Sequence, residues 1–175
     1  MSCQNDLPPV RRSITAHSPS GESIILTTIP SDAEWRHIPT ASFYPAYVTT
    51  TFPIDLRNDV DIPVYLDFLA GPPKATIEGG TILRVVDLGP NTSMPMHRTR
   101  SLDYTVILEG EVELEMDSGD TKIMSRGEIC VQRATNHLWR NVSATAWARM
   151  LYVTISSTGP IVHGEELGQS TESLP

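Results

Sequence analysis

At 175 residues the chain is long enough for one domain with a substantial core, whereas two domains would each be small. Its formal net charge of −8 argues against a nucleic-acid partner, which would need a basic face. No apolar stretch approaches the ~18 residues of a membrane-spanning helix, and the polar amino-terminal residues contain no signal-peptide core, so we predict a cytoplasmic protein without a membrane partner.

The amino-terminal third predicts an arm and an irregular segment. Residues 1–9 are polar and are expected to be disordered, with Cys3 among them. Residues 11–15 and 24–28 are β-rich and flank turn-forming residues, which predicts a hairpin that serves as an edge, an arm or a dimer contact. Between residues 30 and 80, frequent prolines argue against long helices. We expect only one helical turn, starting at residues 31–35, and a short strand over residues 46–51.

The pattern is clearest from residue 79 onward, where short β-rich segments alternate with turn residues. Val112, Leu114 and Met116 alternate with glutamates, which indicates a strand with one solvent-facing side. Cys130 lies in an apolar strand and is expected to be buried and inert. This spacing predicts an antiparallel sandwich or barrel over residues 79–156, followed by a loose tail over residues 157–175. The expected strands cover residues 81–88, 104–108, 112–116, 121–124, 129–133, 139–142 and 146–155.

Three side chains in this region carry the clearest chemistry. His97 and Asp103 lie in the first half of this region and His137 in the second, separated by about as many residues as a small β-barrel contains. Two imidazoles and a carboxylate are group types that hold a divalent metal ion and leave coordination positions open. The sequence therefore predicts that these three side chains converge in a pocket.

The segment from residue 89 to residue 141 resembles the paired motifs of the cupin superfamily. Two histidines, an acid, an asparagine and three glycines carry the resemblance. The second histidine of the first motif is missing, the acid is aspartate rather than glutamate, and Arg133 and Ala134 replace the usual turn residues of the second motif. The matching residues are Gly89, His97, Asp103 and Gly110 in the first motif, and Gly127, His137 and Asn141 in the second.

Over residues 10–156 the chain is similar to small single-domain cupins of filamentous fungi, some encoded beside polyketide synthases. Val10–Thr15 resembles the amino-terminal hairpin of that group. The resemblance implies an all-β fold, a double-stranded β-helix or jelly-roll barrel with an amino-terminal hairpin arm, and a homodimer. It also implies a small aromatic or polyketide-derived substrate.

Three functions remain open at this point. In the first, His97, Asp103 and His137 hold Fe(II), Zn, Mn or Ni, as in the facial triad of non-haem iron enzymes, and support oxidoreductase chemistry. In the second, the same residues perform acid–base catalysis without a metal, in a decarboxylation, dehydration, isomerisation or cyclisation. In the third, the pocket binds a small molecule without turnover.

Residues near the motifs are candidates for substrate contact. Arg98, Arg100, Arg133 and Arg140 cluster around the motifs, and one or two of them are expected to grip a substrate carboxylate or phenolate. Trp139 shares the strand face of His137 and is a candidate pocket wall. The remaining substrate-contact candidates are Gln132 and Met96, whereas His17, His37 and His163 are expected to be surface residues.

Overall fold

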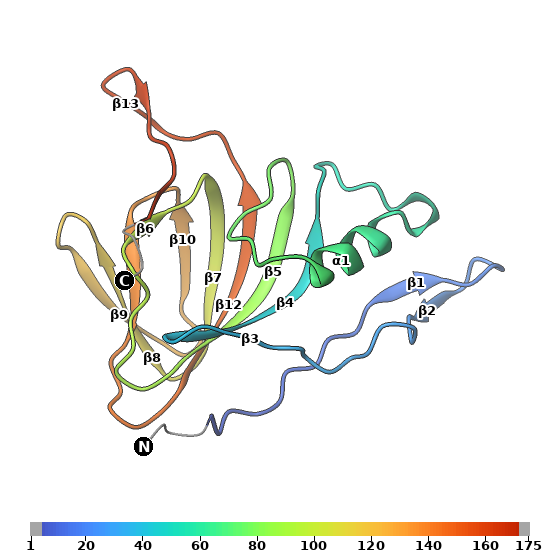
Figure 1. Cartoon of the computed structure of the whole chain (residues 1–175), viewed down its shortest axis with the longest axis horizontal. Helices are drawn as coiled ribbons and strands as arrows, with labels where there is room; N and C mark the ends of the chain where they lie inside the picture. The colour runs from blue at the N-terminus through green and yellow to red at the C-terminus, as the bar shows by residue number, and fades with distance from the viewer. Residues whose placement is uncertain (1–4, 172–175) are drawn as a thin grey trace.

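The computed structural model of the chain describes residues 5–171, in which two antiparallel sheets face one another as a barrel (Figure 1). The larger sheet has the strand order β10-β7-β12-β5-β4-β3. Its long central strands pair over most of their length, which makes this sheet the rigid wall of the barrel. The bounds are β3 Arg36–His37, β4 Ala41–Thr49, β5 Thr81–Leu88, β7 Ser101–Glu109, β10 Ile129–Arg133 and β12 Ala148–Ser156.

The smaller sheet has the order β15-β6-β11-β8-β9 and forms the opposite wall. The strands expected over residues 81–88 and 129–133 have these bounds in the structure, and the others differ by a few residues at their ends. The expected antiparallel barrel is therefore confirmed. The bounds are β6 His97–Arg98, β8 Glu111–Met116, β9 Thr121–Ser125, β11 His137–Asn141 and β15 Ser170–Thr171.

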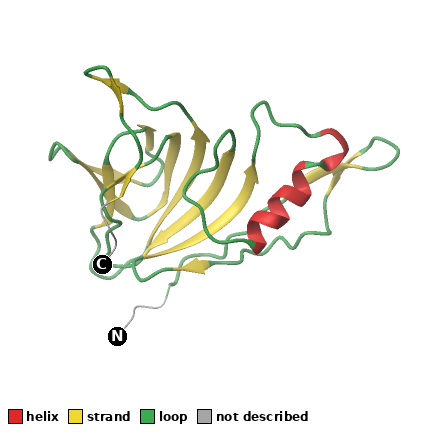
Figure 2. Cartoon of the chain, turned by 45° about the horizontal axis from the view of Figure 1, so that its top comes forward, coloured by secondary structure: helices red, strands yellow, loops and turns green. Residues whose placement is uncertain are grey.

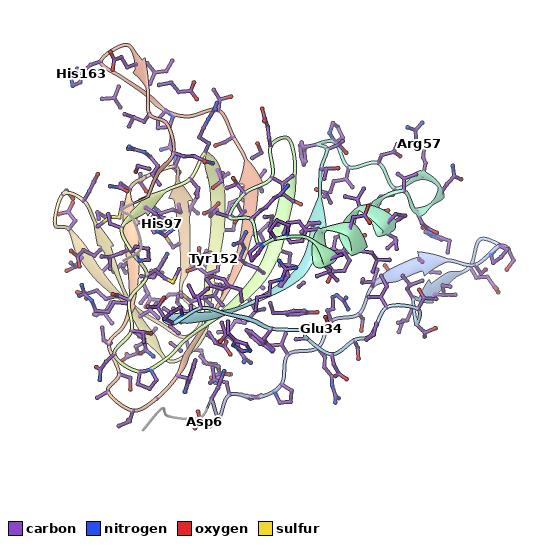
Figure 3. The ribbon with its side chains drawn as sticks, viewed as in Figure 1. Asp6, Glu34, Arg57, His97, Tyr152 and His163 are labelled. Carbon is purple, nitrogen blue, oxygen red and sulfur yellow. The ribbon has the colours of Figure 1, made fainter. Side chains whose placement is uncertain are left out.

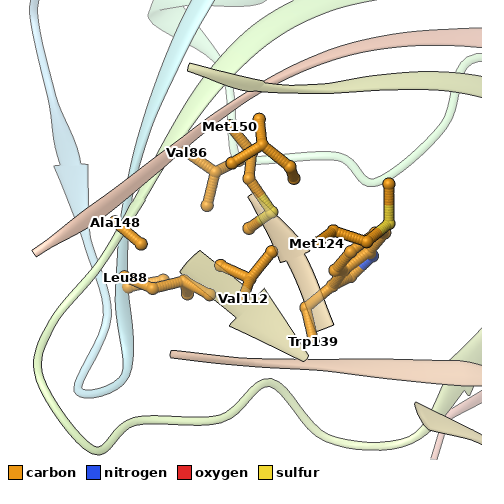
Figure 4. Packing of buried hydrophobic residues seen from close by; sticks show 9 residues of the cluster. Val86, Leu88, Val112, Met124, Trp139, Ala148 and Met150 are labelled. Carbon is orange, nitrogen blue, oxygen red and sulfur yellow. The ribbon is translucent and has the colours of Figure 1, made fainter. Parts of the chain in front are cut away.

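An apolar core fills one end of the space between the sheets (Figure 4). Trp139 and Met124 come from the smaller sheet and pack with Met150 and Leu88 of the larger one. Each of these four side chains is at most 2% exposed. Because hydrocarbon fills this end, the space left for a ligand lies at the other end of the barrel.

Asn141 ties the strand connections together beside this core. Its Nδ2 donates to the carbonyl oxygens of Leu88, Gly89 and Ala146 at 2.9–3.0 Å, and its Oδ1 accepts from the Ser143 amide. Buried carbonyl groups outside regular pairing need such a donor. The motif asparagine therefore has a structural role.

Within the segment expected to be disordered at the amino terminus, residues 5–9 make specific hydrogen bonds with the barrel, and Cys3 lies outside the described residues. Asn5 donates to Asp87, and the Pro8 carbonyl accepts from Arg149. Asp87 and Arg149 form a bidentate ion pair at 2.6 and 2.7 Å on the outer face of the larger sheet. These hydrogen bonds hold the segment around Asn5 and Pro8 against the barrel, although its polar composition is typical of a disordered segment.

The predicted arm is present as a hairpin of β1 (Thr15–His17) and β2 (Ser23–Ile25), which pair only with each other. Figures 1 and 2 show it extending away from the barrel beside the helix. Ile25 is 65% exposed at its end. The expected homodimer stays a prediction.

The expectation for residues 30–80 is wrong in two places. Residues 31–35 form no helical turn, and Asp32 instead bridges to Arg11. A short 3-10 helix, Arg57–Asp59, leads into a ten-residue helix, α1 (Asp61–Ala70), which packs beside β4 (Figure 2). Pro63 is tolerated because it lies in the first turn, where the backbone N–H needs no helical partner.

The tail expected to be loose contains further strands. β13 (Ile161–Val162) and β14 (Glu165–Glu166) form a small hairpin, and β15 adds to β6 at the edge of the smaller sheet. Backbone pairing orders this polar segment, and pairing is not visible in composition. No helix within residues 5–171 is long and apolar enough to cross a membrane.

Candidate active site

A cavity of about 340 Å³ opens between the two sheets and receives side chains from both. Its walls are mainly apolar, and a few polar groups converge in it, as in most small-molecule sites. The lining includes Phe43, Phe68, Arg36, Arg84, His97, Asp103, His137, Trp139 and Tyr152.

His97 and His137 form the centre of the smaller-sheet wall. They are directly paired residues of β6 and β11, and their ring centroids lie 4.5 Å apart with an angle of 46° between the planes. Figure 3 labels His97 on this side and Tyr152 on the larger sheet. The predicted convergence of the two imidazoles is present in the structure.

The backbone sets the tautomer of both rings. Nδ1 of His97 lies 2.9 Å from the Pro95 carbonyl oxygen, and Nδ1 of His137 lies 3.0 Å from the Thr135 carbonyl oxygen. A carbonyl oxygen only accepts, so each Nδ1 carries the proton and donates it. Each Nε2 is therefore left with a lone pair for a ligand, which is the usual arrangement of metal-binding and general-base histidines.

Burial, and secondly the charge of His97, lower the pKa of His137 to about 4, while the hydrogen bond to the Thr135 carbonyl opposes them. Desolvation penalises the imidazolium form of a buried histidine. His137 is therefore a neutral imidazole at neutral pH, able to accept a proton.

Asp103 projects from β7 into the cavity and is only 8% exposed. Desolvation raises the pKa of its carboxyl, while Ser101, Arg84, His97 and Thr154 lower it in that order. Its Oδ1 is buried without a hydrogen-bond partner among the described residues. The carboxyl is thus held near His97 but is incompletely satisfied.

The predicted three-ligand metal centre does not assemble. No group of three or more His, Cys, Asp or Glu side chains within residues 5–171 has a geometry that could hold a metal ion. Asp103 lies on the larger sheet, across the barrel from the histidines, and its strand neighbours there are Gln132 and Thr154. The Nε2 atoms of the two imidazoles could supply two ligands to a metal ion, and the Asp103 carboxylate does not supply the third.

Of the predicted substrate contacts, Trp139 alone lines the cavity. Its ring meets His137 edge-on at a centroid distance of 6.2 Å, as expected for a shared strand face. Gln132 is buried, but it donates to Thr135 rather than to a histidine. Met96 lies beside the cavity lining without belonging to it.

The four candidate arginines point away from the cavity. In a strand, the neighbour of an inward residue faces outward. Thus Arg98, next to His97, donates to Gly168, and Arg140, next to Trp139, pairs with two glutamates. Arg100 pairs with Glu166, and Arg133 is exposed.

Two other arginines line the cavity, and sequence reasoning missed both. Arg84 lies between Ile82 and Val86 on the inward face of β5, and this period of two was the available signal. Arg36 lies in β3, donates to the last carbonyls of α1 and stacks on Phe68. His37, expected at the surface, is exposed and also lines the mouth.

Comparison with known proteins places this barrel in a family. The chain is 47% identical over 161 residues to the Phomopsin biosynthesis cluster protein C′ of Diaporthe leptostromiformis, covering 91% of this chain and 85% of the relative. It is 35% identical over 155 residues to the Cupin-domain-containing oxidoreductase virC of Hypocrea virens, covering 86% and 77%. No protein-family model matches the chain.

Solved structures agree on the fold. The polyketide cyclase RemF of Streptomyces resistomycificus superposes with a TM-score of 0.52 at 16% identity, over 87% of this chain and 88% of that one. The cupin domain of Schizosaccharomyces pombe Cnp3 also gives 0.52, at 11% identity, over 85% and 88%. The chain belongs to the cupin family, and its similarity extends to cupins of fungal secondary-metabolite clusters. The predicted family and fold class are confirmed.

Proposed function

We propose that the protein is an enzyme of fungal-type secondary metabolism that binds a small, mainly apolar metabolite in the barrel and moves a proton on it. The observation that carries the proposal is the pair of backbone-locked imidazoles, His97 and His137, in a mainly apolar cavity. The similarity to a protein of the phomopsin biosynthesis cluster supports the metabolic setting.

The proposed chemistry follows from the protonation states. His137 is neutral at neutral pH and its Nε2 accepts a proton from an acidic C–H or O–H group of the substrate. Nε2 of the resulting His137 imidazolium then returns this proton to the substrate at another atom. The ring centroid of His97 lies 4.5 Å from that of His137, so the Nε2 lone pair of His97 offers a second acceptor for the proton. Phe43, Phe68 and Trp139 exclude water and hold the apolar body of the substrate. Isomerisation, dehydration, decarboxylation and cyclisation are reactions of this kind.

A second candidate is oxidation supported by a divalent metal. Two observations favour it: the relative named as an oxidoreductase, and the two adjacent Nε2 donors. Because the described residues do not complete a three-ligand site, we derive no catalytic step through a metal ion.

The mass of the product distinguishes these candidates. The gene is first deleted in the source organism, and purified protein is incubated with an extract of that deletion strain. The masses of the metabolites before and after incubation are compared by mass spectrometry. An unchanged mass, or the loss of water or carbon dioxide, supports proton transfer, whereas the loss of two hydrogens or the gain of oxygen supports oxidation.

Variants connect the product to the site. His137→Gln and His97→Gln are expected to slow turnover by about 10²-fold or more, the usual contribution of a general acid or base. Arg98→Gln, on the outer face, is the matched control and should retain activity. Undiminished turnover by both histidine variants, or capture of a metabolite without any product, would exclude the proposed reaction.

A further inference from the structure

Two arginines of the larger sheet have guanidinium groups largely removed from water, and only one of them, Arg149, forms an ion pair within residues 5–171. On the outer face, Arg149 is 6% exposed and forms the bidentate pair with Asp87. On the inner face, Arg84 has no carboxylate within 4.0 Å among the described residues. A guanidinium removed from water without an ion-pair partner is costly. Burial lowers the pKa of Arg84, and the charge of Asp103 only opposes this effect.

The hydrogen bonds of Arg84 are also incomplete. Nη2 donates to the carbonyl oxygens of Lys74 and Ala75, which fixes the loop at the cavity mouth. Nε is buried and has no hydrogen-bond partner within residues 5–171. The Arg84 side chain therefore holds the loop at the cavity mouth through Nη2. Its Nε–H donor takes no part in this contact.

The charged side chains that line the cavity are mainly positive. Arg36, Lys74 and Arg84 line it, and Asp103 is the sole acidic side chain of the lining within residues 5–171. Nη2 of Arg36 is engaged by the end of α1 and its guanidinium stacks on the Phe68 ring, whereas Arg84 has a buried Nε without a partner among the described residues. In a protein of net charge −8, this cavity is a local excess of positive charge.

We infer that the substrate is an anion and that Arg84 binds its carboxylate. This assignment rests on the proposed function, which places the reacting part of the substrate at His97 and His137, and it adds the chemical class of the substrate. A guanidinium fork matches a planar carboxylate, and a buried donor left unsatisfied discriminates strongly against a ligand that cannot fill it. Asp103 interacts electrostatically with both Arg84 and His97, so the anchoring group lies near the imidazole pair.

The same residues divide the cavity into two parts. The larger sheet supplies the charged anchor, and the smaller sheet supplies His97, His137 and Trp139. A substrate held by its carboxylate on Arg84 presents its apolar body to the imidazoles across the barrel. Arg84 is therefore a specificity-determining residue.

The test compares two probes of nearly the same shape, benzoate and uncharged benzamide, whose affinities for the full-length protein are measured by ligand-observed NMR titration. We expect wild-type protein to prefer benzoate by about tenfold or more, as a buried charged hydrogen bond implies. In Arg84→Met the preference should disappear while benzamide affinity changes by less than about twofold, because an apolar side chain of similar length remains.

Two further variants control the interpretation. Arg84→Lys keeps the charge without the fork and should retain part of the preference, and it replaces Arg84→Met if that variant does not fold. Arg98→Met, outside the cavity, should behave as wild type. Equal affinities of the two probes in wild-type protein, no benzoate binding, or a benzoate preference that survives loss of the charge would overturn the assignment. The test measures binding alone, so its outcome does not depend on whether the protein catalyses proton transfer.

Discussion

His97 and His137 are direct cross-strand partners, one from each cupin motif, and their rings lie 4.5 Å apart. Both rings donate Nδ1–H to a carbonyl two residues earlier in the chain, so both present Nε2 as an acceptor. A proton bound by His137 would lie in a buried site beside the His97 ring, and both burial and the charge of His97 lower the pKa of His137.

The low pKa of His137 predicts an acid-sensitive fold. The unfolded chain binds a proton near pH 6.5, and the folded chain does so only near pH 4. The stabilising effect is therefore complete above pH 6.5 and is lost as the pH falls toward 4, by on the order of 3 kcal/mol. Urea unfolding across this range should give a shallower pH dependence for His137→Gln than for wild type. Parallel curves would contradict the pKa.

The carboxyl of Asp103 is expected to change stability with pH in the opposite direction to His137. Burial raises the pKa of its carboxyl, so ionisation is harder in the folded state and costs stability as the pH rises through the folded-state value. Asp103→Asn removes that cost and is expected to be at least as stable as wild type at neutral pH, an advantage that fades in acid. Chemical denaturation at pH 7 and at acidic pH measures this. Marked destabilisation at pH 7 would instead identify Asp103 as a structural carboxylate.

Zinc titration separates the histidine pair from the carboxylate. Since Asp103 does not join a ligand cluster with the histidines, Asp103→Asn should bind Zn²⁺ as wild type does. His137→Gln removes one of two adjacent imidazoles and should weaken binding by about tenfold or more. Calorimetry on apo-protein provides both values, and weaker binding by Asp103→Asn would restore the three-ligand prediction.

The buried ion pair of the outer face is expected to dominate the electrostatic contribution to stability. Arg149→Met leaves Asp87 buried and unpaired, and should lower the free energy of unfolding by about 3–5 kcal/mol. The matched control is Arg11→Met, whose ion pair with Asp32 is exposed and should contribute about 1 kcal/mol or less. Similar effects in equilibrium denaturation would show that burial of the pair is unimportant.

Some errors in the sequence-based predictions share one cause. The tail after residue 156 and the segment at residues 5–9 have polar compositions typical of loops, but β15 pairs with β6, and the Pro8 carbonyl accepts from Arg149. Both contacts join residues far apart in the chain, which composition cannot represent. The helix Asp61–Ala70 was missed for a local reason, since Pro63 was read as a breaker although it lies in the first turn.

The sequence by itself determined the fold class, most strands of the barrel and the convergence of His97 with His137, because period-two patterning and motif spacing are local properties. Only the tertiary structure decided which charged groups enter the cavity. Asp103 and Arg84 share the larger sheet, and the motif arginines turn outward next to inward neighbours. Whether a side chain faces a ligand depends on which sheet and which face carries it, and these depend on strand pairing between distant segments.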